Sequence, residues 1–215
     1  FVYRAAKDLG LNGFVQNNAS GVVIEIEGSP SALQAFHQVL KNDKPVQSQI
    51  LNLSSTVLNP QADHDFIIRP SAAGNTISAL MLPDLAVCKD CLREMHDPAD
   101  RRYRYPFTNC TNCGPRFSII KALPYDRLNT SMAAFGMCAT CRAEYENPND
   151  RRYHAQPIAC PDCGPQLSLL NSHGEVIAQR ETALEQTAQA ISAGKIVAFK
   201  GLGGFHLMAD ARNAD

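Results

Sequence analysis

The sequence has no long apolar run, no secretory leader and almost no net charge. Its apolar stretches are short and interrupted, and Phe1-Val2-Tyr3-Arg4 has neither the basic region nor the apolar region of a signal peptide. We therefore expect a cytoplasmic protein that does not enter a membrane. With 20 basic and 21 acidic residues the formal net charge is -1, so there is no chain-wide field to attract nucleic acid.

The two ends of the chain do not resemble domain boundaries. The sequence begins within an expected helix and stops shortly after a glycine-rich turn. A length of 215 residues with 45% hydrophobic content suits one large domain or two small ones. We expect the chain to be an excised fragment of a longer protein.

The cysteines show that part of the chain is duplicated. All eight fall into CxxC pairs, and adding 50 to each cysteine number of the first half gives the matching cysteine of the second half. The flanking sequence has the same period, since residues 97–103 recur as 147–153 and Cys113-Gly114-Pro115 recurs fifty residues later. This regularity indicates two copies of one small fold, repeats 84–133 and 134–170, in a module of residues 80–170.

Each repeat has the ligands for one metal ion. A CxxC turn presents two thiolates to one ion, and two such turns complete a tetrahedron around Zn(II). Four thiolates leave no open coordination position, so we predict two structural Zn2+ ions, each stabilising roughly 26 residues that are too few to fold alone. The predicted ligands are Cys88, Cys91, Cys110, Cys113, Cys138, Cys141, Cys160 and Cys163.

Two questions about these cysteines stay open at this level. Disulfides and redox chemistry are the alternatives to zinc, but cytoplasmic thiols stay reduced, and redox chemistry needs only one pair. The pairs combine either within a repeat, which we favour, or across repeats, as in DnaJ-type chaperones. For His96 and His154 we expect surface or packing roles, because eight cysteines already fill two tetrahedra.

The cationic stretches Arg101–Arg104 and Arg151–His154 have the composition of a phosphate-binding site. Residues 84–170, however, contain eleven Lys or Arg against ten Asp or Glu, and each Zn(Cys)4 centre adds a charge of about -2. We therefore interpret these arginines as solvated ion pairs with the neighbouring aspartates.

The segment before the cysteines predicts an α+β sandwich. A helix in residues 1–10 is followed by a hairpin, a helix that starts at Ser29-Pro30 and has His37 on its core face, and strands at residues 50–57 and 66–69. This order becomes a ferredoxin-like sandwich if its first strand lies upstream.

Residues 1–70 resemble acylphosphatases. The resemblance lies in Arg4-Ala5-Ala6, Leu9-Gly10-Leu11, Gly13-Phe14-Val15-Gln16-Asn17 and Gly21-Val22-Val23. It implies that Asn17, otherwise a turn asparagine, orients the attacking water. The phosphate-binding loop and arginine of that family lie upstream of the helix, so the resemblance implies that this chain alone is inactive toward acyl phosphates.

Residues 175–215 are expected to form the start of a further α/β domain. A helix over 181–193 leads to a strand at 196–199 and then to a glycine-rich turn that matches neither the Walker nor the dinucleotide spacing. A plain tight turn is the alternative to an anion site there. The segment from Gly194 resembles the opening of YrdC-like (Sua5-type) nucleotide-binding domains, which makes Lys200, Gly201, Gly203, Gly204 and His206 the candidate nucleotide contacts.

The three parts in this order resemble the HypF-type carbamoyltransferases of NiFe-hydrogenase maturation, over essentially the whole chain. The resemblance implies that carbamoyl phosphate is cleaved, that carbamate and ATP with Mg2+ give carbamoyl-adenylate, and that the carbamoyl group passes to the C-terminal cysteine of HypE to become cyanide. Closed zinc coordination adds the expectation that the cysteine module is a rigid spacer. A nucleic-acid-binding zinc protein and a DnaJ-like chaperone module are the alternatives.

Overall fold

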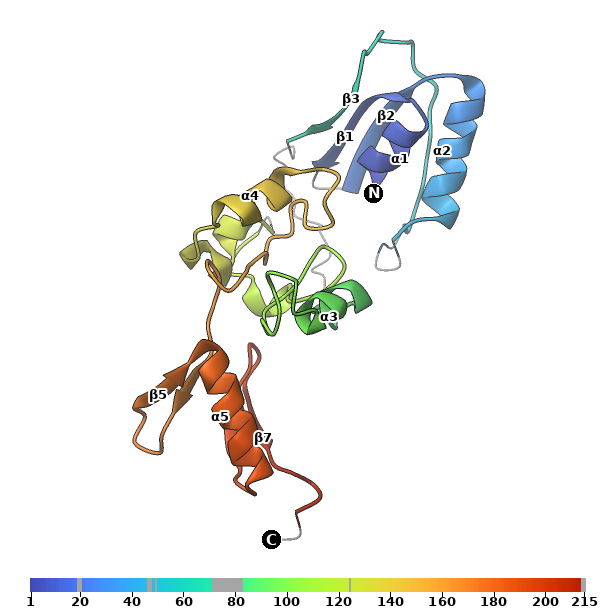
Figure 1. Cartoon of the computed structure of the whole chain (residues 1–215). Coiled ribbons are helices and arrows are strands. Elements are labelled where there is room, and N and C mark those ends of the chain that lie inside the picture. The colour runs from blue at the N-terminus through green and yellow to red at the C-terminus, as the bar shows by residue number, and fades with distance from the viewer. Residues whose placement is uncertain (19–20, 46–47, 49, 71–82, 124, 214–215) are drawn as a thin grey trace. The chain divides into compact units, whose positions relative to one another are not determined.

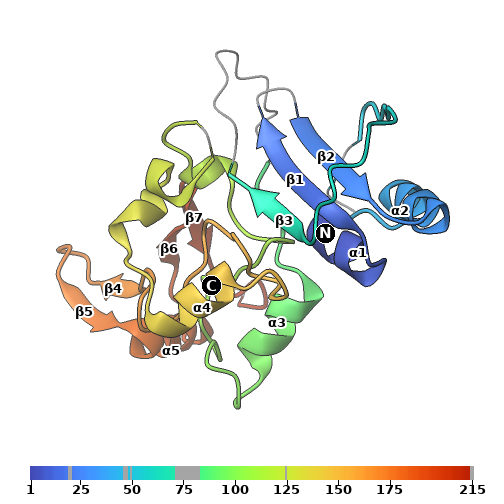
Figure 2. The same ribbon diagram turned by 90° about the horizontal axis from the view of Figure 1, so that it is seen from above.

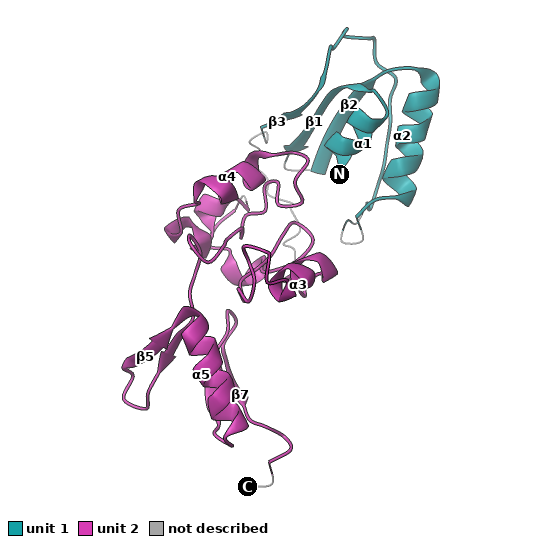
Figure 3. Ribbon diagram, viewed as in Figure 1, with its two compact units in different colours: residues 1–80 teal, residues 81–215 magenta. Residues whose placement is uncertain are grey.

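The computed structural model describes residues 1–18, 21–45, 48, 50–70, 83–123 and 125–213. The chain divides into two compact units, Phe1–Leu80 and Met81–Asp215, which Figure 3 colours separately. Three parts of the expectations lie outside the described residues: the hairpin turn at 19–20, the module start at 80–82 and the last two residues of the chain.

Unit 1 is a three-stranded sheet with two helices packed against it (Figure 1). The strand order is β2-β1-β3, with β1 antiparallel to β2 and parallel to β3, which lies beside it in Figure 2. The elements are α1 (Val2–Asp8), β1 (Asn12–Asn18), β2 (Gly21–Glu27), α2 (Pro30–Asn42) and β3 (Phe66–Arg69). The predicted α+β sandwich is confirmed.

Both helices of unit 1 contribute to one apolar core. The α2 helix begins where its sequence predicts, because the Ser29 side chain accepts a hydrogen bond from the Ala32 N–H at 3.2 Å and Pro30 occupies the first turn. This cap fixes where the helix begins, and His37, which was expected on the core face, is half-buried. The buried core side chains are Ala5, Ala6, Leu11, Phe36, Leu40 and Phe66.

The strand expected at residues 50–57 is wrong. All of these residues are described and none lies in a strand, and the side chains of Leu51 and Val57 are 82% and 101% exposed. The segment has β-forming residues but pairs with none of the described strands, and strand preference depends on such pairing and on burial of one face. The Glu27 carboxylate holds the chain just after it by accepting hydrogen bonds from the backbone N–H groups of Ala62 and Asp63 at 3.2 and 3.1 Å.

Unit 2 begins with the cysteine module, which has little regular structure. Two eight-residue helices, α3 (Lys89–His96) and α4 (Ala139–Glu146), occupy equivalent positions in the two repeats. Three short 3-10 helices lie between them: η1 (Phe117–Ile119), η2 (Arg127–Asn129) and η3 (Ser131–Ala134). Most of the module is therefore turns, whose conformation depends on side-chain contacts and on the cysteines.

The last part of the chain contains two hairpins and a helix. Strands β4 (Ser168–Leu170) and β5 (Val176–Gln179) pair antiparallel, α5 (Arg180–Ser192) follows, and β6 (Val197–Lys200) pairs with β7 (Phe205–Met208). The expected helix and the expected first strand are present within one residue of their predicted bounds, whereas β4, β5 and β7 were not predicted. None of the described helices has the length and apolar character needed to cross a membrane.

The approach of β1 to β2 requires glycine at position 13. Gly13 has φ +122°, and a Cβ placed on it would lie 2.1 Å from the Glu25 carbonyl oxygen. Gly21 also has a positive φ, +143°, but faces open space. We predict that Gly21→Ala costs about 1–2 kcal/mol through backbone strain alone and that Gly13→Ala costs more. Hydrogen exchange of the β1 and β2 amides measures both losses, and equal losses would contradict this packing.

Candidate metal centres

The structure collects the eight cysteines into two groups, each from one repeat. Within each group the four Sγ atoms all lie within 4.8 Å of one another, and five of the contacts between Sγ atoms of one group run from 3.6 to 3.8 Å. A zinc ion with Zn–S distances of about 2.3 Å makes a tetrahedron with edges of about 3.8 Å. The donor set and its dimensions therefore fit Zn(II). The first group is Cys88, Cys91, Cys110 and Cys113, and the second is Cys138, Cys141, Cys160 and Cys163.

The first CxxC of each repeat starts a helix. Cys88 is the N-cap of α3, and its Sγ accepts a hydrogen bond from the Cys91 N–H at 3.5 Å; Cys138 and Cys141 repeat this at the start of α4. The positive end of a helix stabilises thiolates. Neither helix was predicted, although α3 has an acidic residue in its first turn and basic residues in its last, which is a recognisable signal.

The second CxxC of the first repeat is held by a buried arginine. The Cys113 N–H donates to the Cys110 carbonyl at 3.3 Å, which closes the turn. Arg116 then donates to four carbonyl oxygens of this turn at 2.8 to 3.1 Å, those of Cys110, Thr111, Cys113 and Pro115. Sequence reasoning missed this residue, which directly follows Cys-Gly-Pro. At the equivalent position of the second repeat, Gln166 donates to the Pro161 carbonyl.

The repeated arginines cross from one repeat to the other. Arg101 and Arg102 bind Glu144 on α4 of the second repeat, with N–O distances of 3.0 and 2.5 Å. Fifty residues later, Arg151 and Arg152 bind Glu94 on α3 of the first repeat. The two sets of contacts are thus related by the same period as the cysteines.

The interpretation of these arginines as solvated pairs with neighbouring aspartates is therefore wrong. Arg102 is 1% exposed and Arg152 is 4% exposed. The neighbouring Asp97 and Asp100 carboxylates accept instead from local backbone N–H groups, at 2.9 Å from Ala99 and 2.7 Å from Arg102. The aspartates stabilise the turn, which leaves the guanidinium groups to reach the opposite repeat.

Arg101 and Arg151 also contact sulfur atoms of the opposite repeat. Arg101 donates to Cys141 Sγ at 3.3 Å and to Cys138 Sγ at 3.5 Å, and Arg151 donates to Cys91 Sγ at 3.4 Å. These cations oppose the negative charge of about -2 that four thiolates leave on a zinc ion. The arginines therefore supply the charge that each thiolate cluster lacks.

The two glutamates are ionised partners in this network. Burial tends to raise the pKa of Glu94, but hydrogen bonds from Arg152 and Arg151 outweigh it and lower the pKa below its usual value. The pKa of Glu144 is lowered by Arg102 and Arg101 against the same effect of burial. Each carboxylate therefore stays charged and holds two guanidinium groups beside the sulfurs.

The histidines within the repeats are outside both cysteine groups. His96 is exposed, and the His154 ring stacks on Tyr145 with ring centroids 4.9 Å apart. Among the residues that the structure describes, the clusters suited to a metal consist of cysteine alone.

The remaining predicted site residues lie in other parts of the chain. Asn17 is exposed near the end of β1, opposite Val22 of β2. The candidate nucleotide contacts lie together at the β6–β7 hairpin, where the Gly201 N–H donates to the Gly204 carbonyl at 2.8 Å. Lys200 lies over the Phe205 ring, 5.6 Å from its centroid, and His206 is on β7 opposite Phe199.

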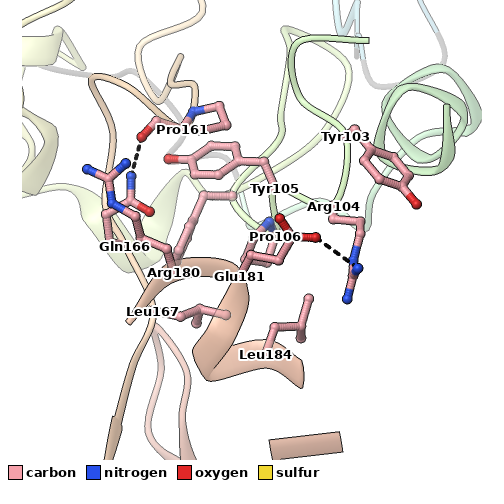
Figure 4. A pocket seen from close by; sticks show the side chains of 11 residues that line it. Tyr103, Arg104, Tyr105, Pro106, Pro161, Gln166, Leu167, Arg180, Glu181 and Leu184 are labelled. Atoms are coloured by element: carbon pink, nitrogen blue, oxygen red, sulfur yellow. Dashed lines mark hydrogen bonds and ion pairs between the residues drawn. The ribbon is translucent and has the colours of Figure 1, made fainter. Parts of the chain in front are cut away.

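A cavity of about 230 Å³ is lined by residues of both cysteine repeats and of the start of α5 (Figure 4). Arg104 borders it and forms ion pairs with Glu181 and Glu185 of α5, at 2.8 and 3.2 Å. These pairs attach the module to the helix that follows it. Other lining residues include Tyr103, Tyr105, Pro106, Gln166, Leu167 and Leu184.

The fold and the cysteine groups define an acylphosphatase-like domain followed by a tandem four-cysteine zinc-finger module. Two protein-family models match the chain, one for each of these two parts. The acylphosphatase model matches residues 1–68, and the model described as HypF finger matches residues 87–120 and 137–170.

Relatives identify the family over the whole chain. The carbamoyltransferase HypF of Synechocystis sp. is 52% identical over 211 residues, and carbamoyltransferase HypF2 of Cupriavidus necator is 51% identical over 217 residues. These matches cover 98% and 100% of this chain but only 27% of each relative. The chain belongs to the HypF family, has its two zinc sites, and spans about a quarter of the length of these relatives.

Two solved structures also match this chain, and both are of HypF proteins. A crystal structure of full-length HypF in a phosphate- and nucleotide-bound form matches with a TM-score of 0.83 and 44% identity, covering 99% of this chain and 28% of that one. The structure of T. kodakarensis HypF matches with a TM-score of 0.82 and 45% identity, covering 99% of this chain and 27% of that one. The resemblance inferred from the sequence is confirmed.

The zinc content of variants distinguishes metal ligands from nearby residues that do not bind the metal. We predict that the purified chain contains two equivalents of zinc, that Cys91→Ser reduces this to one or less, and that His96→Ala keeps both, because only cysteine completes the tetrahedra. Elemental analysis after dialysis measures all three proteins. Loss of zinc in His96→Ala, or two equivalents in Cys91→Ser, would show that the ligand set is wrong.

Proposed function

We propose that the chain is part of a carbamoyltransferase of NiFe-hydrogenase maturation, with carbamoyl phosphate and ATP as substrates and HypE as the acceptor protein. The support is the name and near 50% identity of the HypF relatives along the entire chain. In this reaction, water cleaves carbamoyl phosphate to carbamate and phosphate. Carbamate attacks ATP to give carbamoyl-adenylate and pyrophosphate, and a HypE cysteine thiol then displaces AMP. In a later step the carbamoyl group loses water and supplies the cyanide ligand of the iron.

The acylphosphatase-like domain is proposed to carry out the first of these steps. Asn17 would orient the attacking water through its side-chain amide, and its exposed position near the end of β1 leaves that amide accessible. The phosphate-binding loop and arginine of acylphosphatases precede the helix that corresponds to α1. Cleavage therefore needs those residues as well, and residues 1–215 alone would be inactive.

The β6–β7 hairpin is proposed to contribute to ATP binding, with Mg2+ as the accompanying ion. Lys200 and His206 are both exposed on it and lie on adjacent strands. The turn contributes Gly201, Gly203 and Gly204, whose lack of a side chain lets the backbone approach a phosphate. A solved relative was crystallised in a nucleotide-bound form, which is consistent with nucleotide binding in this family.

Zinc is proposed to be structural, and the module to be a rigid spacer between catalytic domains. Four thiolates fill the coordination sphere, so no position is open for a substrate. Such thiolates persist in a reducing compartment, which supports a cytoplasmic location. The nucleic-acid alternative loses its main support, because Arg102 and Arg152 are buried and bound to glutamates.

A comparison of two asparagines on β1 tests the role of Asn17. In the full-length protein, pyrophosphate release from ATP should depend on carbamoyl phosphate, and Asn17→Ala should slow it about 100-fold because the water loses its orientation. Asn12→Ala, at the opposite end of the same strand, is the control and should change the rate little. A coupled pyrophosphate assay measures the rate in the unaltered protein and in both variants.

The possible failures are distinguishable. Pyrophosphate release that does not respond to carbamoyl phosphate in the unaltered protein would contradict the proposed function. An equal effect of the two asparagine changes would contradict only the role of Asn17.

A further inference from the structure

Each zinc site closes a loop that carries the arginines of the other site. Arg101 and Arg102 lie between Cys91 and Cys110, within the loop that the first site closes. Their guanidinium groups bind the second cluster, where Arg101 reaches two sulfurs and Arg102 reaches Cys141 Sγ at 3.6 Å. The first site therefore orders the residues that face the second.

The reverse contacts complete the symmetry. Arg151 and Arg152 lie between Cys141 and Cys160, within the loop that the second site closes. Arg151 donates to the sulfur of Cys91 in the first cluster. The arginines also bind backbone carbonyls of the opposite repeat. Arg102 Nε donates to the Ala159 carbonyl at 2.9 Å, and Arg152 Nε donates to the Asn109 carbonyl at 3.0 Å. Both carbonyls directly precede a cysteine of the opposite repeat.

The positive charge of the buried arginines and the negative charge of the thiolate clusters both favour these contacts. A buried guanidinium without an anionic partner is costly, and a cluster of thiolates around one ion is costly without a nearby cation. Each pair of arginines has one glutamate partner, Glu144 or Glu94, so one carboxylate charge faces two guanidinium charges. The sulfurs of the opposite cluster supply the remaining negative charge, which exists in full only when the cysteines are thiolates.

We infer that the two sites bind zinc cooperatively, each strengthened by the arginines that the other site holds in place. When one ion leaves, its loop loses closure, and the arginines in that loop no longer face the opposite thiolates. Groups that hydrogen-bond to the ligands of a metal ion, and not to the ion itself, typically contribute 10–100-fold to metal affinity. By linkage, the strengthening must be equal in the two directions. This coupling concerns metal binding and does not depend on the carbamoyl reaction.

Arg151→Gln tests the contact with the first site. The variant removes the donor to Cys91 while leaving all cysteines of both repeats intact. Competition with a chelator should show the first site binding zinc about 10–100-fold more weakly. Alkylation followed by peptide mass spectrometry identifies which cysteines lose zinc, and Cys88, Cys91, Cys110 and Cys113 should react faster than in the unaltered chain although the substitution lies in the other repeat. Arg142→Gln is the matched control, because Arg142 is exposed on the same repeat and its ion pair among the described residues is with Glu146.

Three outcomes would overturn the inference. The first is Arg151→Gln losing zinc no more easily than Arg142→Gln, and the second is faster alkylation confined to the cysteines of its own repeat, as a purely local defect would give. The third comes from a double variant, Cys138→Ser with Cys141→Ser, which empties the second site. Its first site should bind zinc about 10-fold more weakly, and an unchanged affinity would contradict coupling. Arg151→Lys, which keeps the charge, should fall between Arg151→Gln and the unaltered chain.

Discussion

The cysteine module depends on charge compensation between its two repeats. Four thiolates around one zinc ion leave a net negative charge, and buried charge is tolerated only when it is paired. Arg101 and Arg102 donate to sulfurs of the second cluster and Arg151 donates to a sulfur of the first, while Arg152 is bound to Glu94 of the first repeat. Glutamates on α3 and α4 hold these arginines, so the thiolates, guanidinium groups and carboxylates form one network across the repeat boundary.

This network explains how a segment with so little apolar core has a defined structure. One core cluster of the module has four buried members, which come from both repeats: Tyr105, Ile119, Met132 and Ala159. Metal closure reduces the entropy cost of ordering the loops, and the arginines orient one repeat on the other. Tyr105 adds a hydrogen bond to the Pro165 carbonyl at 3.0 Å, and Arg104 extends the contacts to α5. The module is thereby suited to hold the segment that follows it.

The sequence predicts local features of this chain well and contacts between repeats poorly. The cysteine spacing, the cap at Ser29 and the helix that ends near Gly194 were all recognisable because their signals lie within a few residues. The strand at 50–57 was wrong because strand formation depends on a pairing partner that its own residues do not reveal. The pairing of Arg102 with Glu144 joins residues 42 positions apart. Its signal was present, since Glu94 recurs as Glu144 with the same period as the arginines, but only the fold shows that the two repeats exchange partners.

The most direct measurement is the population of one-zinc chains during titration of the metal-free protein, read by native mass spectrometry. Two independent sites, equal or unequal, give about half or more of the chains with one ion at half saturation, whereas mutual strengthening gives clearly less. The cross-repeat network predicts that metal-free and two-zinc chains dominate at that point. A one-zinc population of half or more would contradict it.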